Sequence, residues 1–224
     1  MATFVLVHGA FGSPAELAPV IPELEALGHR AIAVDLPCTD PAAMLEDYVH
    51  TVVEAMVGIE GPVVVVGHSA GGATISLVPD RTRVDRLVYV TAFVPEPGLS
   101  LGELAGDEVR ETILAVSRDD GNGCRSFDLE LLAPIVPPEE LETYLAFLEA
   151  TQRPQGWAAI EQPWPGQSLP DVPCTYVLCT EDNLLPPATQ REMAARLGVE
   201  PVELASDHAA FSLRPRELAP LLVG

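Results

Sequence analysis

Short runs of apolar, mostly β-branched residues alternate with longer amphipathic segments along most of the chain. Four consecutive valines at 63–66 are typical of a strand that is buried on both faces of a sheet. Similar runs predict five further strands: Thr3–Val7, Ala31–Val34, Arg86–Thr91, Cys174–Cys179 and Pro201–Leu204. Helices are predicted between or after these strands, over residues 14–27, 44–57, 70–78, 187–197 and 215–222. This alternation predicts an α/β fold, with a mainly parallel six-stranded sheet and helices on both faces.

The first predicted helix has recognisable signals at both ends. Ser13 before Pro14 is typical of an N-cap followed by proline at the first helical position, and Glu16 is expected to cap back. Gly28 is expected to end the helix. Two prolines near its start interrupt an otherwise regular apolar stripe.

The alternation of strands and helices stops at about residue 92 and resumes after about residue 170. The segment between is rich in proline and acidic residues, and it has a charged loop over 118–125, a predicted helix over 138–150 and no clear strand. Because a structureless loop of this length is implausible in a compact domain, we expect a mostly helical cap. The chain is therefore predicted to be one domain, 1–224, with the cap inserted at about 95–170.

Composition narrows the classes of molecule that this protein is expected to bind. A formal net charge of −21 disfavours binding to nucleic acid or to an anionic membrane, since both repel an acidic surface. No apolar run approaches the roughly 18 residues of a membrane span, and no secretory signal is recognisable, so a cytoplasmic protein is expected. The four cysteines lack C-x-x-C spacing, which favours reduced thiols over a disulfide framework or a zinc site.

The pentapeptide Gly67–Gly71 fits the pattern G-x-S-x-G, directly after the valine strand and directly before a predicted helix. In that context Ser69 would sit on a tight, strained turn at a helix N-terminus, where free N–H groups favour developing negative charge. The sequence therefore favours Ser69 as a nucleophile. The alternative is an ordinary strand-to-helix turn that happens to contain a serine.

A serine nucleophile needs a base and an acid that orients the base. His208 follows the last predicted strand, and loops after parallel strands gather at one edge of the sheet, so it is the expected base. His68 is expected to point away from that place, while His8 could shape the loop after the first strand. Asp182, after the fifth strand, is the expected acid, with Glu181 as the near alternative. Asp207 is less suited, because an immediate neighbour rarely folds back onto the ring.

A tetrahedral intermediate also needs backbone donors for its oxyanion. The N–H of Ala70, directly after the nucleophile, is one expected donor. The loop after the first strand should supply a second, and Gly9 would let its backbone approach closely. Ala10 N–H is the first choice there and Phe11 N–H the next.

In these motifs the chain resembles the α/β-hydrolase superfamily, and within it the branch of plant methylesterases, hydroxynitrile lyases and related small bacterial esterases. The resemblance is carried by the segments Phe4–Ala10, Gly67–Gly72, Val177–Asp182, Ser206–His208 and Ser212–Pro215. It implies Ser69, His208 and Asp182 as a catalytic triad. Hydroxynitrile lyases of this branch have a threonine and a lysine where this chain has Gly9 and Ala209, so no lysine would stabilise departing cyanide.

These observations predict a serine hydrolase that cleaves a small or medium carboxylic ester, or a lactone or thioester, through an acyl-enzyme. It would need no cofactor and no metal, and its partner would be the small-molecule substrate. A homodimer is compatible with the sequence. Two alternatives stay open: a lyase on the same scaffold, and a ligand-binding protein without catalytic activity. Aromatic residues expected near the pocket without an assigned role are Phe11, Phe93, Trp157 and Trp164.

Overall fold

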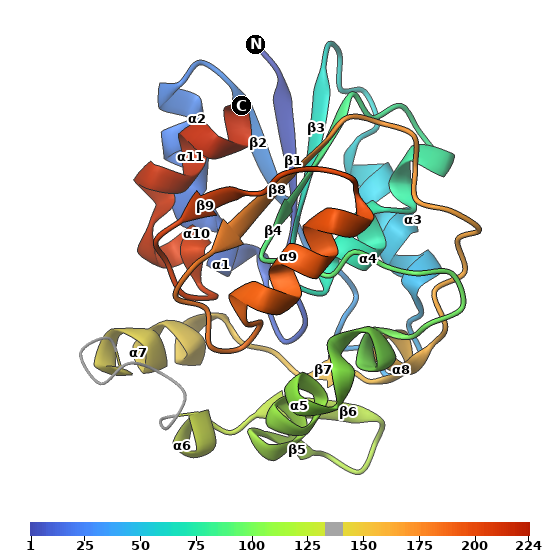
Figure 1. Cartoon of the computed structure of the whole chain (residues 1–224), viewed down its shortest axis with the longest axis vertical. Helices are drawn as coiled ribbons and strands as arrows, with labels where there is room; N and C mark the ends of the chain where they lie inside the picture. Colours follow the sequence, from blue (N-terminus) through green and yellow to red (C-terminus); the bar gives the residue numbers. More distant parts are fainter. Residues whose placement is uncertain (133–140) are drawn as a thin grey trace.

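A six-stranded parallel sheet forms the centre of the molecule in the computed structural model, which describes residues 1–132 and 141–224 (Figure 1). Its strand order is β2-β1-β3-β4-β8-β9, and every neighbouring pair is parallel. The strands are β1 Thr3–Val7, β2 Arg30–Val34, β3 Val63–His68, β4 Arg86–Val90, β8 Cys174–Cys179 and β9 Val202–Leu204. The six predicted strands and their parallel arrangement are confirmed, with shifts of one or two residues at four of them.

Alternation of side chains along the strands separates two apolar layers. In β1, Phe4 and Leu6 face one layer, whereas Val5 and Val7 face the other. One layer is covered by α3 (Leu45–Ala55), α4 (Gly71–Ile75) and α9 (Pro187–Arg196). The other is covered by the helices of segment 14–26, by α10 (Ala210–Leu213) and by α11 (Pro215–Val223). Burying both faces explains why the valine run of β3 needs no alternation of polar residues.

The first predicted helix is divided in the structure. It consists of α1 (Pro14–Leu17), a 3-10 turn over Ala18–Val20 and α2 (Ile21–Ala26). Pro19 and Pro22 lack the N–H that a continuous α-helix would use, which accounts for the division. Ser13 is the N-cap residue and Pro14 follows it at the first helical position, as predicted. The expected capping bonds are absent: the Ser13 side chain makes no capping hydrogen bond, and the Glu16 carboxylate turns toward the interior.

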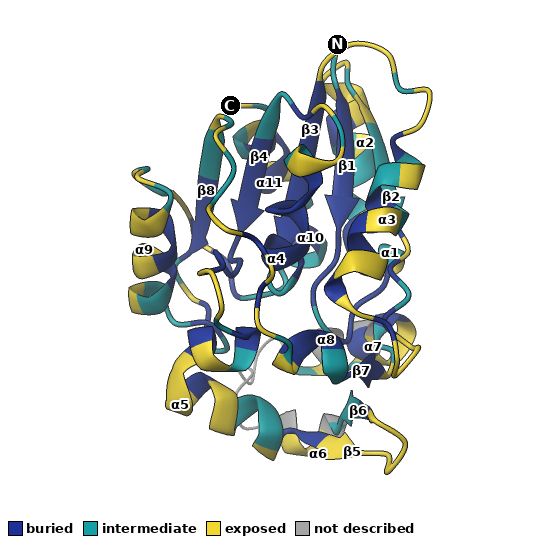
Figure 2. Ribbon diagram, turned by 90° about the vertical axis from the view of Figure 1, so that its right-hand side faces the viewer, coloured by how far each residue is buried: buried dark blue, intermediate teal, exposed yellow. Residues whose placement is uncertain are grey.

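The segment between β4 and β8 lies across the carboxyl ends of the sheet strands (Figures 1 and 2). It contains α5 (Leu101–Ala115), α6 (Leu129–Leu132), α7 (Leu141–Thr151) and α8 (Ala158–Glu161). It also contains a small antiparallel sheet of β5 (Ser117–Asp119), β6 (Cys124–Phe127) and β7 (Gln155–Gly156). The prediction of a cap without a clear strand is therefore wrong. Of the predicted helix 138–150, residues 138–140 lie outside the described part.

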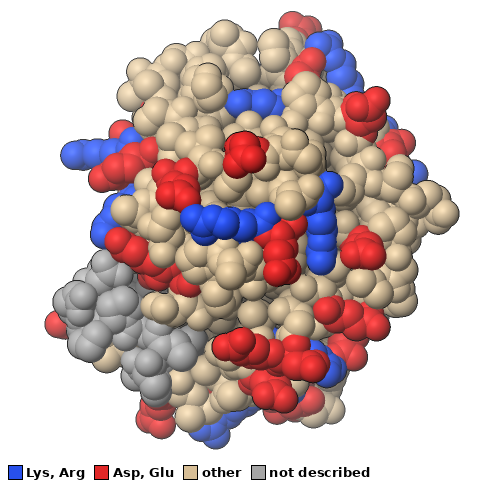
Figure 3. Space-filling model, viewed as in Figure 1, with Lys and Arg blue, Asp and Glu red and all other residues tan. Residues whose placement is uncertain are grey.

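Acidic side chains are frequent at the surface, as the composition predicts (Figure 3). Figure 3 shows Asp and Glu side chains interspersed with basic ones over one face of the molecule. All four cysteines are free thiols, and three of them are buried. Within the described ranges no helix combines the length and the apolar character needed to cross a membrane.

Candidate active site

Ser69 stands on a strained turn between β3 and α4, with a φ of 50°. A positive φ is costly for a residue with a side chain, and it is held here by tight packing of the glycines around it. A Cβ at Gly72 would come within 2.2 Å of the Phe93 carbonyl oxygen, and one at Gly67 within 3.0 Å of the Gly71 backbone. The strain predicted for this turn from the sequence is therefore present.

His208 and Asp182 meet beside Ser69, although they come from different loops. The Nδ1 of His208 lies 2.7 Å from Oδ2 of Asp182, whose side chain is fully buried. The other carboxylate oxygen of Asp182 accepts the backbone N–H groups of Leu184 and Leu185, at 2.9 and 2.8 Å. Glu181, the near alternative from the sequence, is exposed to solvent. Thus the structure places Asp182, and not its neighbour, against the imidazole.

Thr91 is a residue of this cluster that the sequence analysis did not identify. It follows β4, has a φ of 37°, and donates its hydroxyl proton to Oδ2 of Asp182. Its hydroxyl oxygen also lies 3.4 Å from Nδ1 of His208. Because Thr91 ends a buried apolar strand, its one signal in the sequence was a polar residue at the carboxyl end of a strand, where ligands bind in such sheets.

Asp182 and His208 shift one another's pKa. Burial alone would lower the pKa of His208, but the charge of Asp182 and the hydrogen bond to it raise that pKa above 6.5. Burial alone would raise the pKa of Asp182, but the charge of His208 and the hydrogen bonds from His208 and Thr91 lower it. Asp182 is therefore a stable carboxylate that favours the protonated form of His208.

The loop after β1 brings its backbone up to Ser69. A Cβ at Gly9 would lie 2.8 Å from the Cβ of Ser69, so this close approach requires glycine. The N–H of Phe11, the second expected donor, is already donated to Oε1 of Gln155 at 3.3 Å. Among the described residues, no internal hydrogen bond uses the N–H groups of Ala10 and Ala70. These two groups stay available to an oxyanion.

His68 lies differently from the expectation. Its ring packs against that of His208, with centroids 4.8 Å apart, and its Nε2 lies 2.9 Å from the carbonyl oxygen of His208. On the other side its Nδ1 lies 3.2 Å from Oε1 of Glu16. The expectation that His68 points away from the base was wrong, because His68 is still part of β3 and faces the same side of the sheet as Val64 and Val66, which is also the side of Phe211 and the His208 loop.

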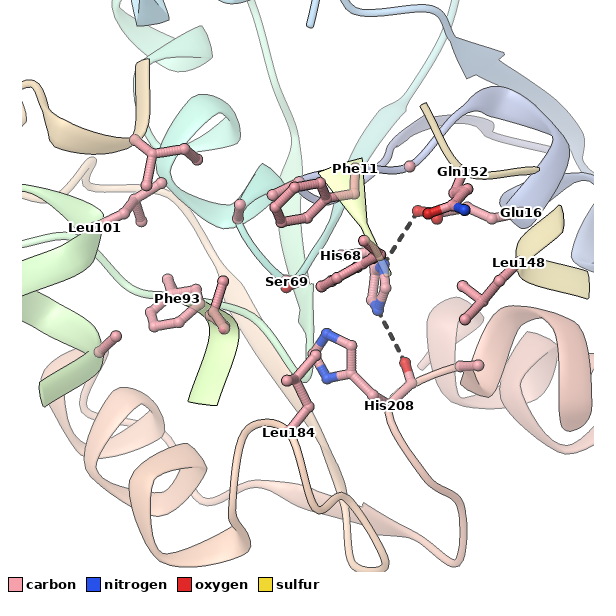
Figure 4. A pocket seen from close by; sticks show the side chains of 18 of the residues that line it. Phe11, Glu16, His68, Ser69, Phe93, Leu101, Leu148, Gln152, Leu184 and His208 are labelled. Atoms are coloured by element: carbon pink, nitrogen blue, oxygen red, sulfur yellow. Dashed lines mark hydrogen bonds and ion pairs between the residues drawn. The ribbon is translucent and has the colours of Figure 1, made fainter. Parts of the chain in front are cut away.

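Ser69 and His208 line one cavity between the sheet edge and the cap (Figure 4). Its walls are mostly apolar, and Phe11 packs there against Phe127 with ring centroids 4.0 Å apart and the rings tilted by 33°. Phe93 and Trp157 also line the cavity, whereas Trp164 packs in the core and donates its indole N–H to Ala73. No cluster of side chains suited to a metal ion occurs in the part of the chain that the structure describes.

Comparisons with known proteins find relatives that are named as hydrolases and esterases. Pyrethroid hydrolase of Sphingobium wenxiniae is 30% identical over 96% of this chain and 84% of that protein. Methylesterase 2 of Arabidopsis thaliana is 28% identical over 98% of this chain and 94% of that protein. The crystal structure of a pyrethroid hydrolase from Sphingobium faniae superposes with a TM-score of 0.81 at 27% identity, covering 100% of this chain and 96% of that one.

The crystal structure of polyneuridine aldehyde esterase gives a TM-score of 0.78 at 25% identity, covering 100% of this chain and 98% of that one. The family model described as "Alpha/beta hydrolase family" matches residues 4–221. That range spans both the sheet and the cap, and the strand order agrees with the expected α/β-hydrolase fold. The chain therefore belongs to the alpha/beta hydrolase family.

Proposed function

We propose that this protein is a carboxylesterase that uses Ser69, His208 and Asp182 as a catalytic triad. The observation that carries the proposal is the hydrogen bond between His208 and the buried Asp182, at 2.7 Å, in a cavity that Ser69 also lines. Relatives named as esterases and hydrolases over nearly the whole chain support the same class of reaction.

In the proposed mechanism His208 accepts the proton of the Ser69 hydroxyl through Nε2, because its Nδ1 is bound to Asp182. The serine oxygen attacks the ester carbonyl, and the N–H groups of Ala10 and Ala70 receive the oxyanion. His208 then passes the proton to the leaving alcohol, which leaves an acyl group on Ser69. A water molecule, deprotonated by the same imidazole, releases the acid and restores the free serine.

The walls of the cavity support an uncharged, largely apolar ester as substrate. The apolar lining residues come from both the sheet edge and the cap: Phe11, Phe93, Leu101, Ile113, Phe127, Leu148, Trp157, Leu184 and Phe211. Of the charged lining groups, Glu16 contacts His68, and Arg110 pairs with Glu161 at 3.2 Å. Lactones and thioesters with apolar groups belong to the same proposal, since they present the same carbonyl to Ser69.

The lyase alternative has less support. Ala209 lines the cavity directly after the base, where it offers no cation for departing cyanide. Gly9 has no room for a threonine side chain in this arrangement, given the 2.8 Å that separates its Cβ position from Ser69. Incubation with mandelonitrile should release no cyanide above the uncatalysed background.

The test is a comparison of the wild type with Ser69→Ala and with Ser168→Ala, which removes an exposed serine of the cap segment. Ser69→Ala should lose hydrolysis of p-nitrophenyl acetate and covalent labelling by a fluorophosphonate probe, measured by intact mass. Ser168→Ala should retain both. Wild-type activity in Ser69→Ala, or a wild type that the probe does not label, would overturn the proposal.

A further inference from the structure

A buried glutamate and a histidine outside the triad connect the first helix to the main chain of the base. Oε1 of Glu16, on α1, lies 3.2 Å from Nδ1 of His68, and Nε2 of His68 lies 2.9 Å from the carbonyl oxygen of His208 (Figure 4). The same oxygen of Glu16 accepts the N–H of Gly9 at 3.3 Å, one residue before the expected oxyanion donor Ala10. The side chains of Glu16 and His68 are only 14% and 9% exposed.

The donor and acceptor atoms in this series of contacts determine how many protons the series must contain. A carbonyl oxygen only accepts hydrogen bonds, so Nε2 of His68 must carry a proton that it donates to His208. A carboxylate also only accepts, so the contact between Nδ1 and Glu16 needs a second proton between the two atoms. A neutral imidazole beside an ionised carboxylate would lack that proton, and two lone pairs would face each other at 3.2 Å.

The surroundings favour a carboxylate at Glu16 in this contact. Burial alone would raise the pKa of Glu16, but the hydrogen bond from His68 and the charges of His68 and His8 lower it. The ionisable and charged groups around the pair come from the loops after β1, β8 and β9 and from the cap: His8, Arg153, Asp182, Asp207 and His208.

We propose that Glu16 and His68 share one proton and act together as a positioning pair for the catalytic base. His68 holds the main chain of His208 through Nε2, and Glu16 holds the His68 ring in the orientation that this bond requires. Glu16 is thus a positioning residue, and it also connects the loop of Gly9 to the loop of His208. This inference rests on the proposed esterase function.

The support of His208 depends on the shared proton. Without it the lone pair of Nδ1 would face the carboxylate of Glu16, and the contact would be repulsive. A glutamine at position 16 can donate its amide N–H to a bare Nδ1, so it keeps the contact without the extra proton.

The first experiment compares kcat and KM for p-nitrophenyl acetate across pH in Glu16→Ala and Glu16→Gln, with Glu25→Ala, an exposed glutamate of α2, as control. Glu16→Ala should lower kcat by about 10-fold to 100-fold with little change in KM, since small displacements of a catalytic group cost about that much. Glu16→Gln should recover most of that loss, because the glutamine amide keeps the contact with Nδ1.

Three results would overturn the proposal. They are wild-type kcat in Glu16→Ala, a rise in KM alone, which would make Glu16 a substrate contact, and a loss of kcat in Glu16→Gln as large as that in Glu16→Ala. Circular dichroism of each variant separates a loss of folding from a loss of positioning.

A second experiment does not depend on activity. Nitrogen-15 NMR of labelled histidine should show a hydrogen-bonded proton on Nδ1 of His68 in the wild type and a bare Nδ1 in Glu16→Gln, with His68→Gln used to assign the signals. A bare Nδ1 in the wild type would contradict the shared proton. Because this readout needs no turnover, it separates a failure of the pair from a failure of the esterase proposal, which the Ser69→Ala assay tests.

Discussion

The carboxyl edge of the sheet and the cap segment line the same cavity, but they supply different groups to it. The sheet edge supplies Ser69 and His208, and the buried Asp182 behind them. The cap supplies chiefly apolar side chains such as Phe127 and Leu148. Figure 2 shows the central strands β1, β3 and β4 buried, whereas much of the cap is exposed. Under the proposed function, the sheet edge therefore carries the chemistry and the cap the choice of substrate.

The largest effect should come from the sheet side, in Asp182→Asn. This change removes the charge that raises the pKa of His208 and allows the wrong imidazole tautomer. We expect kcat to fall on the order of 10⁴-fold, as for the equivalent change in a serine protease triad. The sign of the pH effect follows: without the carboxylate the pKa of His208 falls, so the acid limb of kcat/KM moves to lower pH.

The matched control is Glu181→Gln, one residue away and exposed. The pH profile of kcat/KM for Glu181→Gln, measured by steady-state kinetics, should match that of the wild type. If Asp182→Asn kept wild-type kcat and the same acid limb, the division between a catalytic sheet edge and a selective cap would lose its basis.

The same difference explains how much of the structure could be predicted from the sequence. Parallel strands buried on both faces are nearly all apolar, so β3 and β8 were recognisable without any partner in view. The cap strands are two to four residues long, and β5 carries Arg118 and Asp119, so no periodicity could develop. Their pairing depends on tertiary contacts, among them the bond from the N–H of Gly156 to the Cys38 carbonyl.

Within the site, a motif could identify Ser69 and loop position could identify His208, because both signals are local. Glu16 was predicted to cap its own helix, a local explanation that the structure replaces with contacts to Gly9 and His68. Thr91 was equally hidden, since its partner Asp182 lies 91 residues further along the chain. The contacts of Glu16 and Thr91 join segments far apart in the chain, and no local motif marks either residue.

A smaller effect on the sheet side is expected from Thr91→Val, which keeps the shape of the side chain and removes the hydroxyl. Asp182 would lose one donor, and a hydrogen bond to a charged group contributes about 1.5–3 kcal/mol. We expect kcat/KM to fall about 10-fold to 100-fold, with KM nearly constant. Thr91→Ser, which retains the hydroxyl, should stay close to the wild type. Equal losses in the two variants would show that the methyl group, and not the hydrogen bond, matters.

The smallest effect on turnover, and the one that tests the cap directly, is expected from Leu148→Ala. Leu148 lines the cavity from α7, so its truncation enlarges the space for the substrate without touching Ser69 or His208. Hydrolysis of p-nitrophenyl acetate should change little. The ratio of kcat/KM for a bulky ester to kcat/KM for the acetate should rise about 10-fold, since a few methylenes in an apolar pocket change kcat/KM by about that factor. Leu145→Ala, on the same helix but not among the cavity residues, should leave the ratio unchanged. A uniform loss for both esters in Leu148→Ala would mean that the cap supports the catalytic groups as well, and the separation of roles would fail.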